Sequence, residues 1–541
     1  MSTSSDASSP PSTPATSQPA SPTPALAKLS LQDISDADKA AAVELKTQAN
    51  KAFTSHEFNR AADLYTEAIG KNPADATLWC NRAYTRIKLE EHGYGLSDAS
   101  TAIELDPKYA KAYYRRATCY LQTLRYKQAI ADFKKLLALE PQNQLVRMQM
   151  DSTQKILRKV EFEKAIEMEE EKSAVLRCLE IIDEGGCGMD KDYAGPLLPQ
   201  GDDGKYRVDI DFVRKMLAWF KDGKAIPRRY VWEIVLGAHA HFEREESLVT
   251  VEIPDGQTID VIGDVHGQLY DYLHLLSLTG EPSETHSLLM NGDLVDRGSW
   301  SVEIILIALA FKWLYPKTMY INRGNHEAKE MNRTYGFEGE AKHKYGEQTY
   351  KLFAHLFTAM PLATLICATK PPPSSAAKAI LSPEGRKRHF VVHGGLFSKD
   401  GVTLDDIRKI QRVGRQPGQE GLMCEFLLWT DPQELPGRGP SKRGVGIAFG
   451  PDITRRWCES NGVTGVIRSH EVRQDGYSVE HDGLCTTVFS APNYVDQTGN
   501  KGAFIRIDAA GTEKYTQFEA QPHPPMKPMA YASSGLASLL M

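Results

Sequence analysis

The sequence predicts a multidomain protein in which an all-α superhelix precedes a larger α/β domain. Two observations carry this prediction. Between residues 40 and 145 the chain repeats itself in units of about 34 residues, whereas from about residue 205 short apolar runs alternate with segments of helical pattern. In the second part, several apolar runs end in Gly-rich turns that carry polar side chains. Because open α/β sheets build their sites at the carboxyl ends of strands, these turns form the candidate functional region.

The composition is that of a globular protein with more than one core. The chain has 541 residues, of which 41% are hydrophobic and 25% charged, a length that suits about two to four domains. A net charge of −6 argues against nucleic acid as the main partner. The eight cysteines are scattered without a Cys-x-x-Cys pair, which is typical of reduced thiols. With no signal-peptide pattern and a longest apolar run (304–311) too short to span a bilayer, we expect a cytoplasmic and nuclear protein.

The N-terminal part divides into a tail and a repeat. Residues 1–27 are rich in Ser, Pro and Thr, with almost no charge, and are predicted to form a disordered tail. Pro73, Pro107 and Pro141 are then spaced by one repeat unit each. Small residues at helix contacts, with a Pro closing each unit, are typical of tetratricopeptide repeats (TPR). We therefore expect three TPR units over residues 40–145, about the minimum for a stable stack.

The first helix of each repeat would line the concave face of this stack. Cationic and amide side chains fall on that face with helical spacing: Lys46, Asn50, Asn81, Lys88, Lys111 and Arg115. Such a pocket suits an extended acidic peptide that ends in a free carboxylate. The stretches 44–50 and 111–117 resemble carboxylate-clamp TPR domains, which implies binding of the acidic C-terminal tail of the ninety-kilodalton heat-shock chaperone (heat-shock protein 90). The alternative is a set of ordinary solvated helix charges.

The middle of the chain connects the repeats to the second domain. Residues 146–190 are predicted to form one long, charged helix that serves as a linker. Glycines between residues 185 and 204 mark the boundary that follows. The α/β domain is assigned to residues 195–520.

Three motifs within this domain point to a metal centre. They are Gly-Asp-Val-His-Gly at 263–267, Gly-Asp-Leu-Val-Asp-Arg-Gly at 292–298 and Arg-Gly-Asn-His-Glu at 323–327, and two later strand ends add imidazoles. The predicted metal ligands are Asp264, His266, Asp293, Asn325, His393 and His470. Oxygen and imidazole ligands without Cys suit Mn, Fe or Zn in hydrolytic chemistry better than a structural zinc. We expect Asp293 to bridge two cations, because ions about 3.5–4 Å apart need an anion between them.

The other polar residues of these motifs have roles that follow from their type. A hydroxide between the two cations would attack a phosphate ester in line. Arg297 and Arg443 would clamp the non-reacting phosphoryl oxygens, and His326, oriented by Asp296, would protonate the leaving oxygen. Tyr494 would place its hydroxyl over the phosphate, or alternatively serve packing alone. The predicted substrate contacts are Arg297, Asn325, His326, Arg443 and His470.

The segment 264–496 resembles the catalytic domain of the phosphoprotein phosphatases, the dinuclear-metal Ser/Thr phosphatase family. The resemblance includes His-Gly-Gly-Leu-Phe at 393–397 and Ser-Ala-Pro-Asn-Tyr at 490–494. It implies a central β-sandwich flanked by helices, two divalent ions (Mn most expected in a preparation) and hydrolysis of phosphoserine and phosphothreonine in phosphoprotein substrates. With a TPR array in front, it further implies autoinhibition by coverage of the cleft, relieved by chaperone tails or fatty acids. Residues 521–541 resemble a C-terminal helix that helps to hold the closed state, and we expect a monomer.

The chain departs from the family pattern in three places. A Pro-rich insert at 369–389 replaces a tight hairpin and is predicted to be a surface loop. Val495 stands where relatives commonly have Cys, which would alter sensitivity to thiol-reactive inhibitors. Gly535 would weaken the last helix by up to ~1 kcal/mol relative to Ala.

Two other classes of function remain open on sequence alone. A metallophosphoesterase acting on small molecules, such as the symmetrical dinucleoside-polyphosphate hydrolases, shares the first three motifs. A chaperone-binding adaptor with a purely structural phosphatase domain is the second. The segment 490–494 and the repeats argue against the first, and the complete ligand set argues against the second.

Overall fold

The computed structural model describes residues 34–166, 173–188, 192–372, 379–417 and 427–532. The predicted N-terminal tail, the centre of the 369–389 insert and the end of the predicted C-terminal helix lie outside these residues. The described part of the C-terminal region, 521–532, contains turns and no helix. Among the described helices, none is long and apolar enough to cross a membrane.

The N-terminal domain consists of three antiparallel helical hairpins and a longer closing helix. The helices are α1 (Asp36–Thr54), α2 (Phe58–Lys71), α3 (Ala76–Lys88), α4 (His92–Leu105), α5 (Ala110–Gln122), α6 (Tyr126–Leu139) and α7 (Gln144–Ile166). Ala49, Ala83 and Ala117, one in each repeat, are fully buried where helices cross. Their small side chains let neighbouring helices approach closely, as the sequence period predicts.

The linker differs from the single long helix that the sequence predicts. α7 ends at Ile166, and a separate helix, α8 (Ala174–Asp183), begins after Ser173. The Ser173 hydroxyl caps α8 by accepting a hydrogen bond from the Val175 N–H at 3.3 Å. Since a capping residue has extended backbone angles, it starts a new helix and cannot continue an old one, so the prediction of one helix was wrong.

The α/β domain is a sandwich of two sheets flanked by helices, which confirms the predicted fold class. The six-stranded sheet has the order β1 (Leu248–Ile253), β5 (Ala363–Ala368), β6 (Arg388–Val392), β10 (Gly465–Arg468), β12 (Cys485–Val488) and β11 (Tyr477–Glu480). The five-stranded sheet has the order β14 (Glu513–Phe518), β13 (Gly502–Asp508), β2 (Thr258–Ile262), β3 (His286–Met290) and β4 (Met319–Ile321). Val261 and Leu289 of one sheet share a buried cluster with Val391 and Ile467 of the other. Burial on both faces explains why these strands are continuous apolar runs.

Helices and a small third sheet complete the domain. The helices are α9 (Ile210–Lys221), α10 (Arg228–Phe242), α11 (Leu269–Thr279), α12 (Ser301–Leu314), α13 (Lys329–Tyr335), α14 (Phe337–Tyr345), α15 (Glu347–Ala359), α16 (Leu404–Arg408) and α18 (Pro451–Asn461). A short sheet of β7 (Asp431–Pro432), β9 (Ile447–Phe449) and β8 (Arg438–Pro440) holds the loop that carries Arg443. Residues 369–387 of the insert lie between β5 and β6, which pair antiparallel, whereas Arg388 and His389, predicted as loop, are the first residues of β6.

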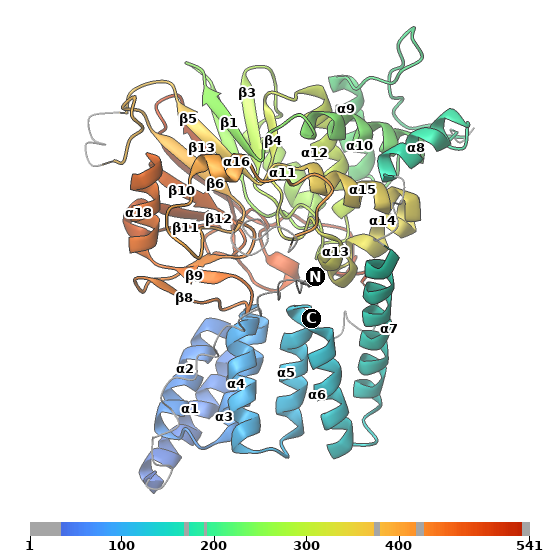
Figure 1. The fold of residues 1–541 in the computed structure, drawn as a ribbon. Helices are drawn as coiled ribbons and strands as arrows, with labels where there is room; N and C mark the ends of the chain where they lie inside the picture. Colours follow the sequence, from blue (N-terminus) through green and yellow to red (C-terminus); the bar gives the residue numbers. More distant parts are fainter. Residues whose placement is uncertain (1–33, 167–172, 189–191, 373–378, 418–426, 533–541) are drawn as a thin grey trace, which may run out of the picture.

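The repeats stand against one face of the α/β domain (Figure 1). The ends of α3 to α6 point toward that domain, and α7 runs up beside it to α14. Lys159 of α7 forms an ion pair with Glu338 of α14. This arrangement brings the repeats next to the strand ends that carry the motifs.

Candidate metal centre and catalytic cleft

Five strands from both sheets deliver the six predicted ligands to one place. Asp264 and His266 follow β2, Asp293 follows β3 and Asn325 follows β4, all in the five-stranded sheet. His393 follows β6 and His470 follows β10 in the six-stranded sheet. All six side chains are buried. The structure therefore brings together every residue that the sequence nominated as a ligand.

The donor atoms of these residues form two overlapping groups. In the first, ligand atoms of His266, Asp293 and His326 lie within 4.8 Å of one another, and in the second those of Asp293, His393 and His470 do. Asp293 is common to both. Its Oδ2 lies 3.5 Å from His266 Nε2 and 3.2 Å from His393 Nε2. His326, which the sequence nominated as a proton donor, also lies at the edge of the first group.

The remaining two ligands close the cluster. Asp264 Oδ2 lies 3.6 Å from His266 Nε2, and Asn325 Oδ1 lies 2.9 Å from His393 Nε2. The backbone N–H of His470 donates to Asp264 Oδ1 at 3.0 Å, which ties the two sheets together at the site.

Backbone carbonyls fix which nitrogen of two imidazoles faces the cluster. His266 Nδ1 lies 3.0 Å from Val295 O, and His393 Nδ1 lies 2.9 Å from Asn291 O. A carbonyl oxygen only accepts, so Nδ1 must carry the proton in each ring and Nε2 is left as a ligand.

The donor set fits divalent cations. His470 Nδ1 lies 3.2 Å from His393 Nε2, so both imidazoles turn a nitrogen toward the buried carboxylates of Asp264 and Asp293. Burial disfavours the charged form of His266, yet the carboxylates of Asp264 and Asp293 raise its pKa to about 9. The site thus attracts positive charge strongly, which two cations held by oxygen and imidazole donors would supply.

Strained backbone is concentrated at this centre. His266, Asp293 and His470 have φ angles of 39°, 52° and 73°, in the left-handed region that non-glycine residues rarely adopt. Asp296 and Arg297 share this feature, with φ angles of 70° and 69°. Such strain persists only where the surroundings hold it, and it is found mostly at functional sites.

The predicted proton donor and its partner are in hydrogen-bond contact. His326 Nδ1 lies 2.9 Å from Asp296 Oδ2. The other oxygen of Asp296 accepts the N–H of Phe337 at 2.9 Å, and Asn332 Nδ2 donates to Oδ2 at 3.2 Å. Asp296 is therefore held from three sides and fixes the orientation of the His326 ring.

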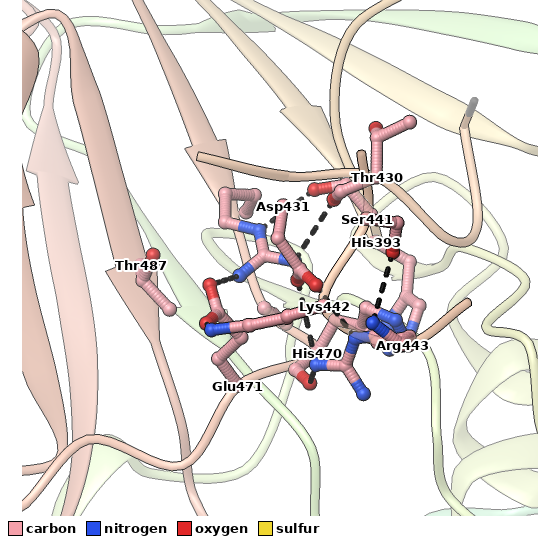
Figure 2. A network of polar contacts seen from close by, with 12 residues as sticks. His393, Thr430, Asp431, Ser441, Lys442, Arg443, His470, Glu471 and Thr487 are labelled. Carbon is pink, nitrogen blue, oxygen red and sulfur yellow. Dashed lines mark hydrogen bonds and ion pairs between the residues drawn. The ribbon is translucent and has the colours of Figure 1, made fainter. Parts of the chain in front are cut away.

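The two predicted phosphate-binding arginines are both engaged by carboxylates. Arg297 Nη2 lies 2.7 Å from Glu90 Oε1, a residue of the TPR domain, and its guanidinium lies 4.1 Å above the Tyr335 ring. Arg443 Nε lies 2.7 Å from Asp431 Oδ2, and its Nη2 donates to the His470 carbonyl at 2.6 Å (Figure 2).

Asp431 is shared with a second arginine that is completely buried. Arg468 Nη2 lies 2.9 Å from Asp431 Oδ1, and its Nη1 lies 2.6 Å from Glu471 Oε2. Glu471 also pairs with Lys442, the residue before Arg443. This network anchors the Arg443 loop beside the ligand His470.

Tyr494 lies against the centre as expected from its motif. Its ring centroid is 5.3 Å from that of His266 and 5.3 Å from that of Phe489. Burial raises the pKa of its hydroxyl well above the usual value, so the group stays a neutral donor. Val495 beside it has a φ of 50°.

The TPR domain and the metal centre enclose one cavity of about 450 Å³. Glu90, His92 and Tyr84 from the repeats line it, together with Asp264, Asp293, His326 and Arg443 from the catalytic side. Of the predicted peptide clamp, Lys88 and Arg115 face this cavity. Arg115 lies 3.5 Å from the centroid of the Tyr84 ring, and Lys88 lies 5.9 Å from it.

The other clamp residues lie on the helices away from the cavity lining. Asn81 Nδ2 donates to Asn50 Oδ1 at 3.5 Å, so these two amides are neighbours. Lys46 pairs with Asp75 at 3.5 Å and donates to Thr77. Lys111 is exposed on the first turn of α5. Of the six residues, Lys88 and Arg115 therefore line the cavity and the other four do not.

Several residues at the site were not nominated from the sequence. Glu90 and Asp431 hold the two arginines, Arg468 and Glu471 anchor the Arg443 loop, and Glu327 binds the backbone of two ligand loops. Glu327 belongs to the motif at 323–327 and could have been found there. Glu90 lies in a different domain, and no local pattern relates it to Arg297.

Family profiles match successive parts of the chain. The calcineurin-like phosphoesterases match residues 257–474, the PPP5 TPR repeat region matches residues 150–250, and the tetratricopeptide repeat matches residues 110–143.

Curated relatives are similar to nearly the whole chain. The serine/threonine-protein phosphatase T of Aspergillus oryzae is 47% identical over 94% of this chain and 100% of its own length. Human serine/threonine-protein phosphatase 5 is 42% identical over 91% of this chain and 93% of its own length. A solved Saccharomyces cerevisiae protein serine/threonine phosphatase, described as similar to human PP5, shares 41% identity with a TM-score of 0.54 and covers 60% of this chain and 100% of that chain.

Proposed function

This chain belongs to the serine/threonine-protein phosphatase 5/T family, and we propose that its TPR array holds the phosphatase closed until an acidic peptide opens it. The enzyme is a protein serine/threonine phosphatase with divalent metal ions. The observation that carries the proposal is the ion pair between Glu90 of the repeats and Arg297 of the cleft, at 2.7 Å.

The catalytic part of the proposal assigns a task to each residue of the centre. Two cations, most readily Mn²⁺, would be held by Asp264, His266, Asp293, Asn325, His393 and His470. When bound, they supply Lewis-acid polarisation and a water acidic enough to act as the nucleophile at neutral pH. His326 gives the proton of its Nε2–H to the leaving Ser or Thr oxygen, and the Asp296 carboxylate stabilises the charged ring. Arg297 and Arg443 bind the phosphoryl oxygens.

The closed state would block this chemistry at its substrate-binding groups. A phosphate cannot bind Arg297 while Glu90 occupies the guanidinium. The N–H groups of Gly93 and Tyr94 donate to Lys442 O at 2.7 and 3.3 Å, and Arg125 Nη2 donates to Gly444 O at 3.0 Å. These bonds fasten the repeats to the loop that carries Arg443.

Peptide binding and closure would use the same side chains. Lys88 and Arg115 belong to the predicted clamp and also face the shared cavity. An acidic chaperone tail, such as the C-terminal tail of heat-shock protein 90, would draw these cations into new ion pairs and thereby release the cleft. A fatty acid, whose carboxylate presents the same charge, is the second proposed activator.

The test compares rates of phosphoserine-peptide hydrolysis with Mn²⁺. We expect the full chain to be slow, and both the chain from Ser173 onward and the full chain with an acidic C-terminal peptide to be faster. His326→Ala should abolish the activity of all three. A full chain that is already as fast as its truncated form would refute closure, whereas no activity in any metal-loaded form would refute the catalytic assignment.

A further inference from the structure

Two loops that carry metal ligands pack backbone against backbone. The loop after β3 contains Gly292, and the loop after β4 contains Arg323 and Gly324. A Cβ on Gly292 would lie 2.6 Å from the Gly324 Cα, and one on Gly324 would lie 2.7 Å from Glu327 Oε2. Both contacts are shorter than side chains tolerate, so glycine at each position allows the close approach.

One buried carboxylate bonds to both of these loops. Glu327 Oε2 accepts the N–H of Asp293 at 2.9 Å and the N–H of Gly324 at 2.8 Å, and Oε1 accepts the N–H of Leu294 at 2.9 Å. The Glu327 side chain is fully buried. Both oxygens of one carboxyl group therefore serve as acceptors for backbone N–H groups of the two loops.

The first of these bonds acts on a strained residue. Asp293 has a φ of 52°, a conformation that costs a non-glycine residue free energy unless its surroundings enforce it. Its N–H is held by Glu327, and its Oδ1 accepts the N–H of His326 at 2.9 Å. Backbone and side chain of Asp293 are thus fixed by residues of the 323–327 motif.

We propose that Glu327 is a positioning residue that holds Asp293 in its left-handed conformation and thereby keeps the Asp293 carboxylate directed at His266 and His393, with which it would hold the cations. In the described structure the hydrogen bonds of the Glu327 carboxylate go to the backbone N–H groups of Asp293, Leu294 and Gly324, so we expect it to act through the backbone of the two loops. The inference rests on the metal centre proposed above.

The carboxylate is needed because it accepts at both oxygens. In Glu327→Gln one oxygen becomes an NH₂ group, which would face either the Leu294 N–H or the pair from Asp293 and Gly324. The NH₂ group would then face a backbone N–H in a buried site, with no acceptor between the two donors. One of the two loops would move away as a result. The Asp293 carboxylate would follow its backbone.

Glu340 provides a matched control. It is also buried, and its oxygens accept the N–H groups of Ser301 at 3.2 Å and Val302 at 2.9 Å at the start of α12. Neither loop with a metal ligand is involved. Glu340→Gln therefore removes a buried carboxylate that caps backbone groups and that also pairs with Lys344 at 2.8 Å, without touching the centre.

The experiment titrates Mn²⁺ into the metal-free full chain by calorimetry and by electron paramagnetic resonance. We expect Glu327→Gln to weaken Mn²⁺ binding by about 10- to 100-fold and to lose the spectrum of a spin-coupled ion pair. Glu340→Gln should unfold at a lower temperature but keep wild-type affinity and the coupled spectrum. Glu327→Asp, which keeps the charge but cannot reach all three N–H groups, should lie between Glu327→Gln and the wild type.

Wild-type affinity and a coupled spectrum in Glu327→Gln would overturn the proposal. If Glu327→Gln does not fold, the test uses Glu327→Asp instead. Wild-type affinity of Glu327→Asp for Mn²⁺ would then overturn the proposal. A wild-type chain that binds no pair of ions would instead refute the metal centre itself, so the two failures are distinguishable.

Discussion

At the residue scale, Tyr494 has two possible roles in the cleft, packing or hydrogen bonding to the phosphate. They differ only in whether the hydroxyl oxygen is needed. Its ring packs between His266 and Phe489, whereas its hydroxyl faces the phosphate-binding side of the cleft in the proposed mechanism. Replacement by Phe keeps the ring contacts and removes only the donor. The two roles therefore predict different kinetics.

We expect Tyr494→Phe to fold normally and to lower kcat for a phosphoserine peptide by roughly tenfold or more, as loss of a donor to a transition state does. The measurement is steady-state kinetics of the peptide-activated full chain, with thermal unfolding as the control for packing. An unchanged kcat together with an unchanged unfolding temperature would refute the role of the hydroxyl and leave Tyr494 with packing alone.

Sequence motifs indicated the ligands because the chemistry restricts residue type. Only a few side chains bind divalent cations, and in this chain they follow apolar runs at fixed offsets, so Asp264, Asp293 and Asn325 could be named in advance. Glu90 could not. Its contact with Arg297 comes from the docking of one domain on another, and an acidic residue between two helices of a repeat has no local feature that sets it apart.

At the element scale, the periodic parts of the fold were predictable and the breaks were not. The repeat period places the helix pairs. It also places equivalent ion pairs in successive repeats, Arg82–Asp98 at 2.7 Å and Arg116–Asp132 at 2.8 Å. The start of α8 depends on one capping side chain, Ser173, within a stretch that has helical composition throughout. Propensity summed over a window does not detect such a local choice.

The start of α4 makes an element-scale prediction possible. Gly93 lies in its first turn, and a Cβ there would lie 2.5 Å from the Gly444 N and 2.6 Å from the Ser441 O. Gly93→Ala should therefore push the repeats off the Arg443 loop and raise the basal phosphatase rate several-fold. It should not destabilise α4, since Ala favours a helix by about 0.5–1 kcal/mol over Gly.

Gly70→Ala is the matched control, because Gly70 lies in α2 with nothing within 4 Å of an added Cβ. It should give the same gain in helix propensity with no change in basal rate. The comparison is made by rate assays without peptide and by thermal unfolding of both variants. A Gly93→Ala enzyme with the wild-type basal rate would show that this contact does not hold the closed state.

At the scale of the whole molecule, closure buries a titratable group that the catalytic site does not use. His92 is buried in the shared cavity, and its Nδ1 has no hydrogen-bond partner in the described structure. Burial lowers its pKa to about 4, and Arg297 and Arg443 add to this effect, whereas Glu90 opposes it. Arg297 in turn holds the pKa of Glu90 below its usual value despite burial, so Glu90 stays ionised.

The closed form therefore requires a neutral His92, whereas the open form allows it to protonate near its ordinary pKa of about 6.5. Above that pH neither form binds the proton and closure is unaffected. As the pH falls from 6.5 toward 4, the open form gains a proton that the closed form cannot accept, so opening becomes favoured by up to about tenfold per pH unit. Between pH 7 and 5.5 the ratio of open to closed molecules should rise roughly tenfold.

The distance between the two domains is the quantity to measure, because the catalytic rate has pH dependences of its own. Energy transfer between one fluorophore on the repeats and one on the α/β domain measures the separation directly. His92→Phe, which keeps a buried ring without a titratable nitrogen, should abolish the shift over the same window. If the wild-type domains separate no more at pH 5.5 than at pH 7, or if His92→Phe responds to pH as the wild type does, His92 does not couple closure to pH, and the Glu90–Arg297 pair and the Gly93 contact must hold the repeats in place without it.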